Sequence, residues 1–251
     1  MIALETKTFR ALANTKCRTA TSATIVGVFI VLAMAKQAPA QGASTPYPKM
    51  AEIDQYLMTQ EVEVALARSA APESIAKDAD VLVLDRHGYQ TASKGRNGFV
   101  CLVQRSWSAG LDDPDFWNPK LRAPICLNPP AARSYLPLNI KRTTLVLAGK
   151  TKEQLSVEMK AGFEAKQFPA IEPGAIGYML SKQAYLSDRD GHWHPHIMTF
   201  VPQAKPAEWD ANLRGSPVFG YSDAVDRVSV FMIPVRNWSD GSADCNDGGS
   251  H

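Results

Sequence analysis

A helical spacing of apolar residues opens the folded part of the chain. Residues 49–70 contain no Gly or Pro, and Ile53, Leu57 and Val64 lie among helix-forming residues such as Glu, Gln, Met and Ala. This pattern predicts one helix over residues 49–70. A second, short helix is expected over residues 72–77, because proline is tolerated at a first helical position.

The same spacing returns in residues 151–167. Leu155, Met159 and Phe163 are four positions apart, so they share one face of a helix. Thr151 precedes this run and can cap its first turn with the side-chain oxygen. The sequence therefore predicts a second good helix here.

Between these helices the hydrophobic pattern shortens to that of strands. Three short runs, residues 81–84, 89–93 and 99–104, are separated by glycine-containing turns, which predicts an antiparallel meander. The same reasoning predicts strands at residues 143–148, 175–180, 197–201 and 228–235. The expected fold class is α+β: a meander-like antiparallel sheet with two or three packed helices in a single domain.

The N-terminal 40 residues have the order of segments typical of a secretory signal peptide. A basic leader comes first, an uncharged stretch covers residues 19–35, and Ala38-Pro39-Ala40 offers a small-x-small cleavage pattern. The apolar core, residues 25–32, is shorter than the roughly 20 residues that cross a bilayer, which argues against a permanent span. An uncleaved N-terminal anchor is the alternative. We therefore expect an exported protein, periplasmic or extracellular, with no stable membrane span after cleavage.

Composition divides the rest of the chain into three parts. Residues 41–48 are small and proline-containing, which predicts a flexible lead-in. The folded domain is expected over residues 49–238. Residues 239–251, rich in Asp, Gly and Ser, are expected to form a mobile polar tail.

Removal of the signal reverses the sign of the net charge. The whole chain has 27 Lys and Arg against 25 Asp and Glu, but five of the basic residues and one acidic residue lie in the first 40 positions. The mature chain therefore carries a formal net charge of about −2. Such a chain has no electrostatic attraction for a phosphate backbone, and nucleic acid is not an expected partner.

Three cysteines remain after the signal. We expect a disulfide between Cys101 and Cys126, because both lie in the folded middle of the chain, whereas Cys245 lies in the polar tail. Closing this 26-residue loop would stabilise the fold by about 3.5 kcal/mol. Two buried free thiols are the alternative. Cys245 is then left free or forms an intermolecular bond.

The sharpest candidate for chemistry is a run of alternating histidines. His192, His194 and His196 share one face of an extended chain, and Pro195 favours that extended geometry at His194. A straight strand places His192 and His196 roughly 13 Å apart, so it supplies only an adjacent pair of ligands to one metal ion.

The remaining ligands of such a site must come from elsewhere in the chain. His87 lies in a predicted turn, and Asp188 and Asp190 lie just upstream of the histidines. Two imidazoles, a carboxylate and an open position would suit zinc or non-haem iron. The alternatives are a metal-free histidine that acts as acid or base, and a polar-aromatic surface with no chemical role.

An aromatic loop offers a candidate of another class. Residues 106–124 contain Trp107 and Trp117 among Asp, Pro and Gly. The two indoles could form a binding platform for a sugar ring or an apolar ligand in a non-catalytic binding or interaction domain. Alternatively, the rings hold a long loop on the core.

Overall fold

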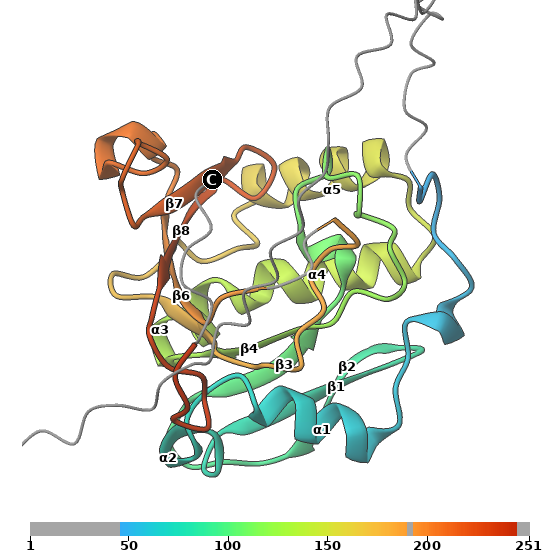
Figure 1. Ribbon diagram of the computed structural model, residues 1–251. Helices are drawn as coiled ribbons and strands as arrows, with labels where there is room; N and C mark the ends of the chain where they lie inside the picture. Colours follow the sequence, from blue (N-terminus) through green and yellow to red (C-terminus); the bar gives the residue numbers. More distant parts are fainter. Residues whose placement is uncertain (1–45, 190–192, 245–251) are drawn as a thin grey trace, which may run out of the picture. The chain divides into compact units, whose positions relative to one another are not determined.

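The computed structural model describes residues 46–189 and 193–244, and an eight-stranded mixed sheet runs through this part (Figure 1). The strands are β1 (Asp80–Asp85), β2 (Gly88–Ser93), β3 (Val100–Gln104), β4 (Ala123–Leu127), β5 (Ile176–Met179), β6 (His196–Pro202), β7 (Phe219–Asp223) and β8 (Val228–Pro234). Their order across the sheet is β2-β1-β3-β4-β5-β6-β8-β7.

Helices cover both faces of this sheet. They are α1 (Gln60–Arg68), α2 (Glu73–Ala76), α3 (Pro129–Ser134), α4 (Leu136–Leu147) and α5 (Lys152–Glu164), with short 3-10 turns η1 (Ile53–Gln55), η2 (Ser106–Ser108) and η3 (Pro206–Trp209). In β3, Leu102 belongs to the larger core beside α3–α5, whereas Cys101 and Val103 belong to the smaller core beneath α1. The sheet thus separates two hydrophobic layers, with α1 and α2 on one side and α3–α5 on the other (Figure 1).

Several predicted elements are confirmed. The strands predicted at residues 175–180, 197–201 and 228–235 are β5, β6 and β8, and the short helix after Pro72 is α2. The helix predicted over residues 151–167 is α5, where Thr151 forms a capping box with Gln154. The α+β class is also confirmed, because the sheet is largely antiparallel and packs against the helices in one compact unit.

The predicted three-stranded meander is wrong in its third strand. β1 and β2 form the expected hairpin, but β3 pairs with β1 and runs parallel to it. The reason lies at Gly95, whose backbone crosses the start of β1 so closely that a Cβ would lie 2.1 Å from the Asp78 carbonyl oxygen. This glycine therefore serves a close backbone approach rather than a tight hairpin turn, and the sheet is mixed.

The strand predicted at residues 143–148 is also wrong, because this stretch belongs to α4. Leu138 and Leu145 lie seven positions apart on the buried face of that helix, and Pro137 stands in its first turn. Short apolar runs with β-branched residues do not distinguish a strand from a buried helix end. The described residues contain five α-helices rather than two or three, and α3, β4 and β7 were not predicted.

The long first helix is interrupted. Residues 49–70 form η1 and α1, with a non-helical link around Tyr56. The fully buried Tyr56 donates its hydroxyl to the Trp117 carbonyl, and its own carbonyl accepts a hydrogen bond from Arg105 Nε. These tertiary contacts hold the link in place of helical hydrogen bonds.

The predicted disulfide is present in the structure. Cys101 in β3 and Cys126 in β4 are direct cross-strand partners with their Cα atoms 4.0 Å apart, and their sulfurs are bonded. Both side chains are fully buried. Cys245 lies outside the described residues.

The described helices have no membrane-spanning candidate: none of them is both long and apolar enough to cross a bilayer. The segment 239–244 forms a turn that pairs with Asn237 through Ala243. The predicted signal, most of the lead-in and the end of the tail lie outside the described residues.

Candidate functional site

The histidine segment enters the sheet at β6, and its first described imidazole is paired with a carboxylate. His194 Nδ1 lies 2.5 Å from Asp244 Oδ2. The Asp244 side chain is only 9 % exposed, whereas that of His194 is 42 % exposed. A carboxylate hydrogen-bonded to Nδ1 fixes the orientation of the ring, which is how the second shell holds metal-binding and base-acting histidines.

His196 is oriented by the neighbouring backbone. Its Nδ1 lies 2.9 Å from both the His194 carbonyl oxygen and Trp193 Nε1, so it can donate to the first or accept from the second. Trp193 is partly exposed, whereas His196 is only 3 % exposed. Donation to the carbonyl is therefore favoured, because it leaves an acceptor rather than a donor unpaired at the buried Nε2.

That nitrogen is one of several buried side-chain polar atoms without a hydrogen-bond partner in the described part of the chain. His196 Nε2 is sealed from solvent and has no hydrogen-bond partner there. Burial lowers the pKa of His196, although the hydrogen bond to His194 opposes this shift. The imidazole is therefore neutral at pH 7, which is the form that binds metals.

The other predicted ligands do not join these imidazoles. His87 is exposed in the turn between β1 and β2, and four strand spacings, about 19 Å, separate β1 from β6. Asp188 accepts hydrogen bonds from the Tyr185 and Tyr47 hydroxyls and from Lys120. The Tyr185 and Tyr47 hydrogen bonds hold the pKa of Asp188 well below its ordinary value.

The remaining two predicted ligands, Asp190 and His192, lie outside the described residues. Within the described ranges, no three His, Cys, Asp or Glu side chains gather as a metal-binding group. A metal site at this segment thus requires ligands from the undescribed residues or donors of another kind.

Both indoles of the aromatic loop are buried. Trp107 is fully buried, donates its Nε1–H to Thr143 Oγ1 at 3.0 Å and packs against Tyr56. Trp117 is 6 % exposed and lies edge-on to Phe116, beside a cavity of about 350 Å³ that Lys150 and Lys152 also line. These contacts favour the alternative in which the rings hold the loop on the core.

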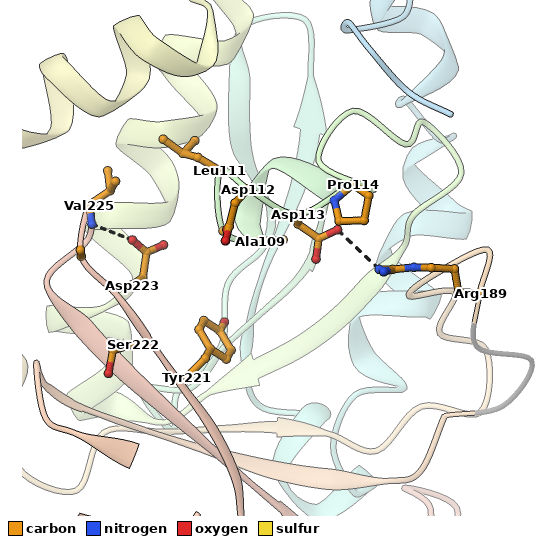
Figure 2. Close-up of a pocket in the computed structure, with 12 residues that line it drawn as sticks. Ala109, Leu111, Asp112, Asp113, Pro114, Arg189, Tyr221, Ser222, Asp223 and Val225 are labelled. Atoms are coloured by element: carbon orange, nitrogen blue, oxygen red, sulfur yellow. Dashed lines mark hydrogen bonds and ion pairs between the residues drawn. The ribbon is translucent and has the colours of Figure 1, made fainter. Parts of the chain in front are cut away.

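A larger cavity lies along the same loop. It has a volume of about 690 Å³ and is bounded by the loop segment 109–114, by residues 221–225 at the end of β7, and by Arg189 (Figure 2). Its polar lining includes the carboxylates of Asp112, Asp113 and Asp223. Arg189 crosses one side, 3.7 Å from Asp113 and 3.2 Å from Asp115. Its volume lies within the usual range for small-molecule sites.

A buried charge network stands behind this cavity. Arg142 of α4 is almost fully buried and lies 3.1 Å from Asp223 and 2.7 Å from Asp226. Burial opposes the charge of Arg142, but the two carboxylates outweigh that effect and raise its pKa. Burial also raises the pKa of Asp226, against the lowering effect of Arg142. This network fixes the wall that carries Asp223.

Tyr221 projects from β7 into the same cavity. Its residue surface is 38 % exposed, yet the hydroxyl points toward the loop segment 109–112 (Figure 2). Enclosure of that hydroxyl raises the pKa of Tyr221, and the nearby Asp223 adds to the shift. The phenol is therefore neutral at physiological pH and can donate a hydrogen bond.

Sequence reasoning missed Arg142, Tyr221 and Asp223. Arg142 comes from α4, whereas Tyr221 and Asp223 come from β7, a strand that the sequence did not predict, and only the tertiary fold brings the two elements together. Comparison of the chain with protein-family models, curated proteins and solved structures finds no match.

Proposed function

We propose that the mature chain acts outside the cytoplasm as a protein that binds a transition-metal ion at the histidine segment. The supporting observation is the hydrogen bond between His194 Nδ1 and the nearly buried Asp244 carboxylate. A carboxylate in this position fixes the ring and makes Nε2 a better ligand. His192 and Asp190 remain the predicted further ligands, and zinc and iron the predicted hard or borderline ions.

Metal titration of the mature chain tests this function. The protein is purified without an affinity tag and with Cys245→Ser, so that neither a tag nor a free thiol binds the ion. Zn²⁺ and Fe²⁺ are titrated separately. The proposal expects binding of one ion per chain, lost in His194→Ala and weakened about 10- to 100-fold in Asp244→Asn.

His87→Ala is the matched control, because His87 is an exposed imidazole far from the segment. It should bind the ion as the parent protein does. Absence of stoichiometric binding in the parent, or equal losses in His87→Ala and His194→Ala, would contradict the proposal.

The cavity beside the loop segment 109–114 favours a second candidate, an exported domain that binds a small organic cation. This candidate keeps the aromatic loop as a binding element but moves the contact from its buried indoles to its polar wall. Asp112, Asp113 and Asp223 provide negative charge from two segments of the chain, and Tyr221 and Leu111 provide apolar surface. Charge-assisted hydrogen bonds from an amine would suit such a lining.

A diamine and a diacid of equal length distinguish this candidate from unspecific binding. Calorimetry should detect 1,4-diaminobutane but not succinate, and Asp112→Asn should weaken diamine binding about tenfold. Asp54→Asn, at an exposed carboxylate outside the cavity, should change nothing. Equal affinity for both probes, or an unchanged affinity in Asp112→Asn, would exclude the cavity as a cation site.

A further inference from the structure

Three methionines occupy strand positions next to the buried His196 on one face of the sheet. His196 in β6 is the direct cross-strand partner of Met179 in β5. Two positions along β6, Met198 is the direct partner of Met232 in β8. Direct partners and residues i and i+2 of one strand project to the same face, so these four side chains share a face of the sheet.

Burial agrees with this assignment of the face. Met179, His196 and Met198 are 7 %, 3 % and 8 % exposed, and all three alternate with more exposed neighbours along their strands. Met179 and Met198 belong to the larger core, and Met232 packs against it. Cβ atoms of direct partners lie about 4.5–5.5 Å apart, which brings the thioether of Met179 within reach of an ion at His196 Nε2.

His196 Nε2 is the second observation that points to a ligand. It is buried, has no hydrogen-bond partner among the described residues, and belongs to a ring whose Nδ1 is held by the His194 carbonyl. A histidine that ligates a metal commonly donates its other ring N–H to a backbone carbonyl. A buried polar atom without a partner requires an explanation, because the apolar side chains of the core offer it no hydrogen bond.

The donor set determines which ion fits. Thioether sulfur is a soft ligand and neutral imidazole a borderline one, both uncharged, and two or more thioethers favour Cu(I) over zinc, magnesium or calcium. Because these ligands carry no charge, a monovalent ion also costs less to bury between them than a divalent one. We infer that His196, Met179 and Met198 form a buried site for a soft monovalent ion, Cu(I) by its chemistry, with Met232 as a fourth donor.

This inference rests on the proposed metal-binding function of the histidine segment, but it assigns a soft ion to His196 and the methionines, apart from the zinc or iron proposed at His194. Methionine is also a common core residue that fills irregular space, so packing alone is the competing explanation. Packing and ligation differ in one measurable respect: only ligation changes the chemical shift of the methionine ε-methyl group when a soft ion binds.

Methionine-methyl NMR provides that measurement. The mature Cys245→Ser protein, labelled at the methionine ε-methyl groups, is titrated with Ag⁺ as a redox-stable soft probe and then with Cu⁺ under ascorbate. The ε-methyl signals of Met179 and Met198 should shift at one equivalent. The signal of Met159, a fully buried methionine of α5, should not.

Affinity completes the test. Competition with a chromophoric Cu(I) chelator should show at least tenfold weaker binding in Met179→Leu and in Met198→Leu, whereas Met159→Leu should bind as the parent does. Leucine conserves volume at all three positions, so each variant is expected to fold.

Three outcomes separate the two proposals. If Ag⁺ and Cu⁺ leave the ε-methyl signals of Met179 and Met198 unshifted while the protein still binds Zn²⁺ or Fe²⁺, the soft site is overturned and the proposed function stands. Unchanged Cu(I) affinity in both leucine variants would overturn the soft site as well. Failure to bind any of the four ions would overturn both proposals.

Discussion

Replacing Glu63 by Gln is expected to lower the free energy of unfolding by about 3–5 kcal/mol. Glu63 on α1 and Arg105 after β3 are both fully buried, with Glu63 Oε2 at 2.9 Å from an Arg105 terminal nitrogen. Glu63 Oε1 also accepts the backbone N–H of Leu84. The amide keeps the shape of the carboxylate but removes its charge, and the Arg105 charge is then buried without a counterion.

Urea denaturation measures this loss. The matched control is Glu172→Gln, which removes the carboxylate of a two-point ion pair with Arg133 that is 36–60 % exposed. That change should cost less than about 1 kcal/mol, because water screens the pair. A loss below about 1 kcal/mol in Glu63→Gln would mean that water reaches the buried pair and that the charge of Arg105 is solvated.

Truncating Trp107 to Ala is expected to cost a similar amount, about 3–5 kcal/mol. The indole is fully buried against Tyr56, and its N–H is bonded to Thr143 on α4. Its loss leaves a large cavity and an unpaired hydroxyl between the aromatic loop and the helix layer. The expected result is a marked fall in the denaturation midpoint with no change in the slope of the transition.

Trp209→Ala serves as the comparison. Trp209 is 44 % exposed and stacks on Phe231, so its truncation should cost about 1 kcal/mol. If Trp107→Ala proves no more costly than Trp209→Ala, the indole is not a packing element and the binding-platform hypothesis for the loop regains its basis.

The sequence correctly predicted the elements whose signals, such as caps and apolar spacing, lie within a short stretch of the chain. The apolar spacing and cap of α5 lie within 14 consecutive residues, and β5, β6 and β8 are short runs bounded by turn residues. The parallel pairing of β1 with β3 was not predictable in this way, because it depends on how the backbone of Gly95 packs against Asp78. The prediction for the C-terminal half of α4 was wrong for a different reason: a Thr-Thr-Leu-Val-Leu stretch occurs in buried helices as well as in strands.

The candidate site was likewise predictable only where its residues lie close together in the sequence. The alternating histidines are visible in the sequence, but Asp244, which orients His194, lies 50 positions further on. The methionines beside His196 come from other strands or from two positions along the same strand, and only the register reveals them. Likewise, Arg142 and Asp223 are ordinary charged residues until α4 and β7 are packed together.

The bond between Cys101 and Cys126 has a consequence for the export that we propose for this chain. Cytosolic thiols stay reduced, so in an exported chain, as we propose, this cross-link would form only after translocation. Before that step the reduced precursor would lack this restraint on its unfolded ensemble, so passage through a channel would require less work. Once oxidised, the same polypeptide would be harder to unfold, and the disulfide would then favour the folded state in the compartment where we propose that the protein acts.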